Sequence, residues 1–311
     1  MSTGTLGRPA QLATPLAGSP EEVRPEQTVP RHLVHRLAIS EVLLTDWQRG
    51  SADSFELHAQ LPRTHSFYDS VDGQHDPLLL AEAVRQAGLL VSHAELGVPR
   101  GHQFLMHSLS LECDPAGLLL KASPADLTLR LNCHDLRYRG RMLAGMAYHV
   151  HIYRAGAPIG IGKASFDCLS PAVYKRLRQA NETAWQSPLP PAVPVSPALV
   201  GRDRARDVVL APTDQPDTWE LRVDRDHPVL FDHAVDHVPG MLLLESMRQA
   251  ARYVSGADPL ALLSLQTDFH HYAELDAPCY VQLTREGAGA VTVTVTQRDT
   301  AVASGRIVLR A

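Results

Sequence analysis

The sequence predicts an α+β protein built from two copies of one unit, each a long central helix wrapped by an antiparallel sheet, packed as a pseudo-dimer. Three observations predict it. Each half of the chain holds one long apolar segment with a helical pattern. Strand-like runs follow each helix with no helix between them, which favours antiparallel pairing because parallel strands need crossovers. The halves also resemble each other residue by residue, and two copies of a unit pack well about a pseudo-twofold axis.

Length and composition fit this prediction and argue against several classes of protein. At 311 residues the chain is long enough for two domains. Its net charge of -5 argues against a general nucleic-acid binder. No apolar run approaches the roughly 20 residues that cross a bilayer, and the first residues do not resemble a signal peptide. A cytoplasmic enzyme or binding protein without a membrane partner is expected, with four reduced, mostly buried cysteines.

Composition divides the chain into four segments. Residues 1–28 are rich in Pro, Gly, Ser and Thr without periodicity, which is typical of a flexible tail. Closely spaced prolines predict an extended linker over residues 187–203. The N-terminal repeat is then expected over residues 29–186, and the C-terminal repeat over residues 204–311.

The first repeat is expected to place two strands before its helix, at residues 41–47 and 54–61. The helix is predicted to start on Pro77, because proline suits the first helical turn, and to end near Gly97. Strand-like runs follow at residues 103–113, 125–136, 141–153 and 158–168.

The second repeat has the same order of elements. Two short strands are expected at residues 207–211 and 218–224, and the helix is expected over residues 239–256. Four strands are then expected at residues 262–272, 279–286, 290–299 and 301–310. The run AVTVTVTQ alternates strictly, which places Val291, Val293 and Val295 on one face of its strand.

The two helices align with one another at the level of single residues. With one gap opposite Gly240, eight of the thirteen positions from His75 are identical to those from His237. His65 and His227 stand ten residues upstream of these two histidines. Agreement of this kind indicates a duplicated unit.

Each helix carries the same three polar residues, and the first helix is otherwise apolar nearly all round from Leu78 to Val91. The three residues lie at positions i, i+3 and i+4, so their side chains share one face. The two sets are Glu82, Arg85, Gln86 and Glu245, Arg248, Gln249. One interpretation is a structural ion pair inherited by both copies. The other is a functional site, which the apolar flanks favour because burying an ion pair costs several kcal/mol per ion unless its geometry is very good.

The entrance of the second helix resembles a known fold. A long helix wrapped by an antiparallel sheet and entered by PGMLLLE resembles the hotdog fold of acyl-thioester enzymes such as the 3-hydroxyacyl-carrier-protein dehydratases. In those enzymes a Pro-Gly pair begins the helix, and its acidic residue works with a histidine across a dimer interface. The second repeat carries the likeness through His233, His237, Pro239, Gly240 and Glu245. The first repeat lacks the Pro-Gly pair and has His75, Asp76 and Pro77 there.

A second resemblance covers nearly all of the chain after the tail. The chain is similar to the A-factor biosynthesis (AfsA) family in VPRHLVHR, EVLLTDW, HDPLLLAEAVRQAG, QFLM, RGRMLAGM, FDCLSPAVY and DHVPGMLLLESMRQAA. The resemblance implies a tandem hotdog protein that makes the precursor of a γ-butyrolactone, butenolide or furan signalling molecule. The implied acyltransferase moves a β-ketoacyl group from acyl carrier protein to the hydroxyl of dihydroxyacetone phosphate, giving a phosphorylated β-ketoester.

This chemistry suggests roles for the shared residues. Transfer from a thioester to an alcohol needs a base, donors for the developing oxyanion and a cation for the phosphate. The candidate proton acceptor is Glu82 or Glu245, aided by His75 or His237 at the helix entrance. The candidate substrate-binding residues are Arg85, Arg248, Gln86, Gln249, His65 and His233. No metal or other cofactor is expected, and direct transfer is favoured because neither a G-x-S-x-G motif nor a credible Cys–His pair is present.

Other partners and functions stay open at this point. The basic runs Arg137–Met142 and Tyr174–Arg178 are candidate contacts for an acidic carrier protein, although such runs are more often solvated surface. A monomeric pseudo-dimer or a homodimer is expected, without a nucleic-acid partner. The alternative enzyme is a hotdog dehydratase or thioesterase that acts on acyl thioesters. The alternative without catalysis is a lactone-binding regulatory protein.

Overall fold

The computed structural model describes residues 25–70, 73–179, 186–255, 262–287 and 289–310, so the predicted tail lies almost wholly outside the described residues. The first half contains β1 (Leu44–Arg49), β2 (Ser54–Leu61), α1 (Pro77–Ala94), β3 (Gln103–Cys113), β4 (Ala125–Arg139), β5 (Met142–Arg154) and β6 (Ala157–Leu169). After α2 (Pro171–Arg178), the second half contains β7 (Leu210–Pro212), β8 (Thr218–Leu221), α3 (Gly240–Ser255), β9 (Leu262–Phe269), β10 (Cys279–Arg285), β11 (Ala290–Gln297) and β12 (Thr300–Leu309).

Every expected strand and both long helices are present, with ends that differ by a few residues. The first strand begins at Leu44, because Ile39–Glu41 forms a 3-10 turn instead. The helix α2 was not expected. The sequence supports it locally, since Pro171 opens the helix and the Ser170 hydroxyl caps it by accepting from the Val173 N–H.

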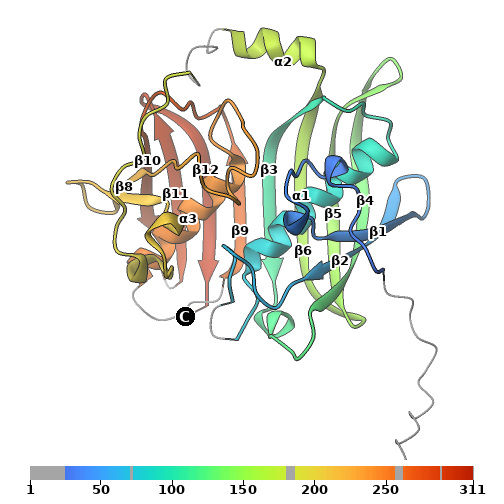
Figure 1. Cartoon of the computed structure of the whole chain (residues 1–311), viewed down its shortest axis with the longest axis horizontal. Helices are drawn as coiled ribbons and strands as arrows, with labels where there is room; N and C mark the ends of the chain where they lie inside the picture. Colours follow the sequence, from blue (N-terminus) through green and yellow to red (C-terminus); the bar gives the residue numbers. More distant parts are fainter. Residues whose placement is uncertain (1–24, 71–72, 180–185, 256–261, 288, 311) are drawn as a thin grey trace, which may run out of the picture.

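The strands form one sheet whose order shows the duplication. The order is β1-β2-β4-β5-β6-β3-β9-β12-β11-β10-β8-β7, so counterparts stand at equal distances from the centre (Figure 1). At the centre β3 pairs antiparallel with β9, from Ser108 opposite Asp268 to Glu112 opposite Ser264. The helices α1 and α3 lie on the same face of this sheet, one over each half (Figure 1). The predicted pair of helix-and-sheet units is therefore confirmed.

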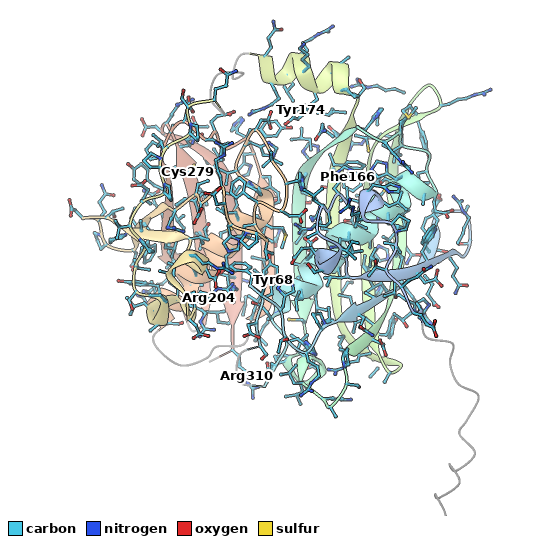
Figure 2. The ribbon with its side chains drawn as sticks, in the orientation of Figure 1. Tyr68, Phe166, Tyr174, Arg204, Cys279 and Arg310 are labelled. Carbon is cyan, nitrogen blue, oxygen red and sulfur yellow. The ribbon has the colours of Figure 1, made fainter. Side chains whose placement is uncertain are left out.

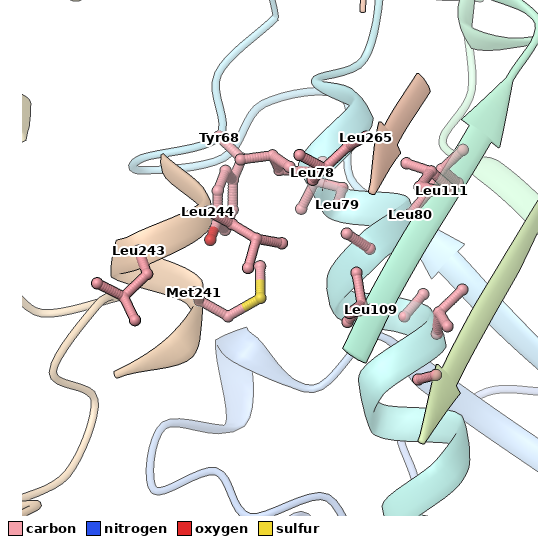
Figure 3. Close-up of a cluster of buried hydrophobic side chains, with 14 of the residues drawn as sticks. Tyr68, Leu78, Leu79, Leu80, Leu109, Leu111, Met241, Leu243, Leu244 and Leu265 are labelled. Atoms are coloured by element: carbon pink, nitrogen blue, oxygen red, sulfur yellow. The ribbon is translucent and has the colours of Figure 1, made fainter. Parts of the chain in front are cut away.

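The core lies between the sheet and the two helices. α1 is buried along nearly its whole length, and it packs so closely on β5 that a Cβ at Gly88 would lie 2.4 Å from the Tyr148 ring. Figure 3 shows Tyr68 and Leu244 together between α3 and α1. On β11 the predicted alternation is confirmed, because Val291, Val293 and Val295 are all buried.

The segment predicted as a linker packs on the second half from Leu189, whose N–H donates to the carbonyl of Leu275 at 3.0 Å. The N–H of Val195 donates to the carbonyl of Leu210 at 2.9 Å, as the N–H of Val29 donates to that of Leu44 at 3.0 Å. Residues 195–202 therefore occupy the place that residues 29–36 have in the first half, and residues 197–200 form a 3-10 turn rather than extended chain. The domain boundaries themselves stay predictions.

The four cysteines are free and buried, as predicted. Burial raises the pKa of each thiol to about 12, so all four stay protonated at neutral pH. Within the described chain, no helix is both long and apolar enough to cross a membrane.

Candidate active site

Glu82 on α1 is the centre of a buried ion cluster. Its carboxylate accepts from Nε and Nη2 of Arg85, from the side-chain amide of Gln86 at 2.7 Å and from Arg36, whose Nη2 lies 2.7 Å from Oε1. Arg36 comes from the loop before β1, and its Nη1 also donates to the carbonyl of Val229 in the second half at 3.3 Å. The cluster therefore joins α1, an N-terminal loop and the opposite repeat.

Glu245 on α3 has the same surroundings in the second half. Its carboxylate accepts from Arg248, from Gln249 at 2.6 Å and from Arg202 at 2.7 Å. Arg202 also donates to the carbonyl of Phe67 in the first half at 2.5 Å. Each repeat thus sends one arginine to its own glutamate and to the backbone of its partner repeat.

Gln86 and Gln249 are fully buried and hold backbone groups. The Gln86 amide accepts from the N–H of Leu43 and donates to the carbonyl of Glu41, at 2.9 and 2.7 Å. Gln249 makes the corresponding bonds to Val209 and Asp207, both at 2.9 Å. These contacts stabilise the chain before the first strand of each half.

The contacts of His65 also stabilise the fold, because its ring binds backbone N–H groups and a buried carboxylate. Its Nδ1 accepts from the backbone N–H groups of Phe67 and Tyr68, and its Nε2 lies 3.3 Å from the Glu41 carboxylate. His227 repeats this arrangement in the second half.

The arginines keep both central glutamates ionised. Burial by itself would raise the pKa of Glu82, but Arg36 and Arg85 outweigh it and lower the pKa to about 2. Arg202 and Arg248 lower the pKa of Glu245 to about 2 in the same way. A carboxylate with so low a proton affinity is a weak base at neutral pH.

Folding stability is expected to fall in acid because of these clusters. Each glutamate has a folded pKa of about 2, below its ordinary 4.5, so its contribution is complete above about pH 4.5 and is lost as the pH falls toward 2. The loss is on the order of 3 kcal/mol for each buried glutamate. Denaturant unfolding at pH 6, 4.5 and 3 measures it. Equal free energies of unfolding at pH 6 and pH 3 would contradict the expectation.

A cavity of ≈ 430 Å³ lies between the repeats at the entrance of α3. Its apolar wall includes Leu89, Leu109, Met241, Leu243, Leu244 and Phe269. Its polar wall includes Arg85, whose side chain is 18% exposed, together with His35, His233 and His237. The cavity can therefore take a ligand that has both an apolar chain and a polar or anionic part.

His237 and Asp236 form a dyad at this cavity. The Nδ1 of His237 lies 2.7 Å from Oδ1 of Asp236, whose pKa is held well below its usual range: burial opposes this, but hydrogen bonds from His237 and Tyr174 prevail. With Nδ1 donating to the carboxylate, Nε2 carries the lone pair and can accept a proton. The His237 side chain is 26% exposed and lines the cavity.

The entrances of the two helices differ in charge. At α1, the Asp76 carboxylate caps the helix by accepting from the Leu78 N–H at 2.8 Å and lies 3.4 Å from Nη1 of Arg248. At α3, Val238 stands in the place of Asp76, and Gly240 opens the helix beside the cavity. The first turn of α3 therefore lies at the cavity wall, and no acid stands at the position that corresponds to Asp76.

The two ion clusters differ for the same reason. Around Glu245, Arg202 and Arg248 form ion pairs with two carboxylates, because Asp76 joins the cluster, and a third arginine, Arg252, lies close by. Around Glu82, Arg36 and Arg85 face one carboxylate, and both arginines reach the cavity. The cavity wall therefore holds two arginines, Arg36 and Arg85, and one carboxylate, Asp232, which accepts from the backbone N–H groups of Leu37 and Ala38.

Of the ten predicted site residues, the structure brings Arg85, His233 and His237 to the cavity. The others lie outside it: Glu82, Glu245, Gln86, Gln249 and Arg248 are buried in the clusters, His75 is buried at the entrance of α1, and His65 lies at a polar surface pocket. Catalytic or substrate-binding roles for these seven residues stay predictions, and their positions outside the cavity do not favour them. For Glu82 and Glu245 the physical reason is neutralisation by two arginines each.

Several residues of the site were missed by the sequence reasoning. Asp236, Tyr174 and Arg36 lie within the motifs that carry the family resemblance, but no catalytic role was predicted for them, although Asp236 directly precedes His237 where the first repeat has Gln74. His35 lines the cavity with a left-handed backbone, φ 51°, at the position where the second repeat has Gly201 with φ 66°. A histidine at a position suited to glycine is a signal that aligning the two repeats could have found.

Known proteins support this description of the chain. The model of the A-factor biosynthesis hotdog domain matches residues 19–170 and again residues 183–311. A 2-oxo-3-(phosphooxy)propyl 3-oxoalkanoate synthase from Streptomyces virginiae is 50% identical over 283 residues, covering 89% of this chain and 96% of the relative. One of the same name from Streptomyces coelicolor is 43% identical over 278 residues, covering 87% and 88%.

Solved structures show the same fold at low sequence identity. The 12:0-ACP thioesterase from Umbellularia californica matches with a TM-score of 0.51 and 11% identity, covering 82% of this chain and 97% of that chain. An acyl-ACP thioesterase from Bacteroides thetaiotaomicron matches with a TM-score of 0.50, also at 11% identity, covering 82% and 98%. Fold and site together define a tandem hotdog protein with a cavity at its internal pseudo-dimer interface, which confirms the predicted fold. The chain belongs to the A-factor biosynthesis (AfsA) family, as its motifs predicted.

Proposed function

We propose that this protein is an acyltransferase of the 2-oxo-3-(phosphooxy)propyl 3-oxoalkanoate synthase type. It condenses a β-ketoacyl thioester with dihydroxyacetone phosphate, and the phosphorylated β-ketoester is the precursor of a γ-butyrolactone, butenolide or furan signal. Its relatives of that name support this reaction. The observation that carries it in this chain is the His237–Asp236 dyad at an apolar cavity whose other polar side holds Arg85.

His237 is the proposed base. Its Nε2 takes the proton of the substrate hydroxyl while the hydroxyl oxygen attacks the thioester carbonyl carbon. The oxyanion that forms is stabilised by the N–H groups of Gly240 and Met241 in the first turn of α3. When the C–S bond breaks, the leaving thiolate takes the proton from His237, so the ester forms without a covalent enzyme intermediate.

Arg85 is the proposed phosphate-binding residue. The excess positive charge of Arg36 and Arg85 over Glu82 favours a phosphate at that side of the cavity. His233, whose side chain is 44% exposed, lies on the same cavity and is a second candidate contact. The apolar side chains of the cavity wall, which include Leu89 and Phe269, then contact the acyl chain.

The outer face of α2 is the proposed contact for the acyl carrier protein. Leu177 belongs to the cavity wall, so α2 stands at the cavity, and Lys175 and Arg176 beside it are exposed. A carrier protein is generally acidic, so its charge complements these two residues. The other basic candidate, residues 137–142, contributes nothing to the cavity wall. One chain supplies every residue of the proposed site. The proposed location of the protein is the cytoplasm, where both substrates are available.

Reversing the charges of α2 is expected to weaken use of the carrier-bound donor. Lys175→Glu with Arg176→Glu should raise KM for the β-ketoacyl carrier protein about tenfold, since each exposed charge pair contributes up to about 1 kcal/mol. KM for a short thioester mimic, which lacks the carrier, should not change. Initial rates with both donors test this. Equal KM changes for the two donors would locate the carrier elsewhere.

Product analysis tests the reaction itself. The purified protein is incubated with a β-ketoacyl thioester, with and without dihydroxyacetone phosphate, and the products are identified by mass spectrometry. A phosphorylated β-ketoester that forms only with both substrates is the expected result. Loss of the thioester without dihydroxyacetone phosphate would instead show a hydrolase. An unchanged thioester together with tight lactone binding would show a regulatory protein.

A further inference from the structure

The helix α2 touches the dyad through two inward side chains. It lies between the repeats in sequence and at one end of the sheet in space (Figure 1). Most of its residues are exposed, but Arg178 is buried and Tyr174 is half-buried. Figure 2 shows Tyr174 on the side of α2 that faces the body of the protein.

Arg178 fixes the backbone and side chain at Asp236. Its Nε donates to Oδ2 of Asp236 at 3.1 Å, and its Nη2 donates to the Asp236 carbonyl at 3.0 Å. Its two terminal nitrogens also hold the Glu274 carboxylate at 2.6 and 2.7 Å. The guanidinium lies 4.5 Å from the centre of the Tyr272 ring. The loop that carries the dyad is therefore tied to α2 by charged, buried contacts.

Tyr174 shares one carboxylate oxygen with His237. The Tyr174 hydroxyl donates to Oδ1 of Asp236 at 2.6 Å, and Nδ1 of His237 lies 2.7 Å from the same oxygen. A second donor on that oxygen takes up part of the negative charge that would otherwise stabilise the imidazolium. The hydroxyl is itself held as a donor, because burial and the bond to Asp236 raise the pKa of Tyr174.

We propose that Tyr174 is a positioning residue that sets the basicity of His237 through Asp236, with Arg178 holding Asp236 in place. The inference rests on the proposed function and assigns a second role to α2, whose outer face is the proposed carrier contact. The first repeat has Gln74 before His75 and so has no counterpart of this arrangement.

The ionisable groups around His237 come from three segments. Asp236 lies on its own loop, Tyr174 and Arg178 come from α2, and Tyr272 and Glu274 come from the segment after β9. His233, His270 and His271 line the same cavity. Among the described residues, the side chains that donate to Oδ1 of Asp236 are those of Tyr174 and His237. Removing the Tyr174 hydroxyl therefore changes the proton affinity of His237 in a predictable direction.

Tyr174→Phe tests the proposal without removing a charge. The pKa of His237, followed by NMR on the imidazole, is expected to rise by about half a unit to one unit, and the acid limb of the kcat/KM profile should move up with it. Tyr253→Phe, at the far end of α3, is the matched control and should leave both unchanged. An unchanged His237 pKa in Tyr174→Phe would overturn the proposal.

Arg178→Lys tests the role of Arg178 separately, and the NMR titration separates the proposed coupling from the proposed reaction. Arg178→Lys retains the charge but loses the forked contacts, and it should lower kcat several-fold with little change in KM for a thioester mimic. An unchanged kcat would remove Arg178 from the proposal. Because the NMR titration needs no turnover, a raised His237 pKa with no ester formed would disprove the proposed reaction and not the coupling through Asp236.

Discussion

His237→Gln is expected to lower kcat by about 10²- to 10⁴-fold, the range that general-base catalysis supplies. Glutamine keeps a polar side chain of similar size but cannot take the hydroxyl proton. Folding should be nearly unaffected, since His237 is partly exposed and, within the described chain, its side chain hydrogen-bonds to Asp236 and Tyr174. Initial rates with a thioester mimic and dihydroxyacetone phosphate, together with thermal unfolding, measure both effects.

His75→Gln is the matched control, because His75 is the counterpart of His237 in the first repeat. It is buried, its Nε2 has no hydrogen-bond partner in the structure, and it lies outside the cavity wall. It should retain most of the activity. A loss in His75→Gln as large as that in His237→Gln would show that both helix entrances are catalytic, and the assignment to one site would be wrong.

Glu245→Gln is expected to lower the free energy of unfolding by about 3–5 kcal/mol, the cost of breaking a buried ion pair by removing one partner. Gln249 and the arginines keep hydrogen-bond contact with the amide oxygen, but the positive charges of Arg202 and Arg248 then lack their principal counter-charge. The variant should also lose much of the decrease in stability between pH 4.5 and pH 3. Denaturant unfolding across this pH range measures both.

Glu82→Gln is the natural comparison, because its cluster already has an excess of positive charge beside the cavity. It should destabilise the fold as well, and any loss of activity should follow the loss of folded protein. Full stability with a kcat more than a hundredfold lower in either variant would contradict the structural role. It would support these glutamates as proton acceptors, the role that the helix pattern first indicated.

The two repeats share the same buried ion pairs, but they differ in the residues at the start of the central helix. The shared pairs are Glu82 with Arg36 and Glu245 with Arg202, which tie each helix to the opposite repeat. The entrance differs at two equivalent positions, Gln74 against Asp236 and Asp76 against Val238, and the second repeat has the added Gly240. The first change removes the partner of the histidine, and the second places a carboxylate where an oxyanion would have to form. We therefore expect the entrance of α3 to be the single catalytic site.

The sequence by itself determined the elements and their duplication, because hydrophobic periodicity, helix caps and turn residues are local signals. The sequence alone predicted the helix from Pro77 and the paired Glu–Arg–Gln faces. It also predicted the alternation at Val291, Val293 and Val295. The unexpected helix α2 shows the limit of such signals, since its eight residues make only about two helical turns, too short a span for a helical period to stand out.

Only the tertiary structure decided which of the paired residues can act. Whether a glutamate is a base depends on the cations near it, and Arg36 and Arg202 reach Glu82 and Glu245 from more than forty residues away. Whether a histidine is a base depends on its partner and its access to a cavity, and His237 has both because α2 and the loop before α3 meet at Asp236. The proton affinity of these side chains depends on contacts between segments that are distant in the chain. The residue pattern of a single helix holds no information about such contacts.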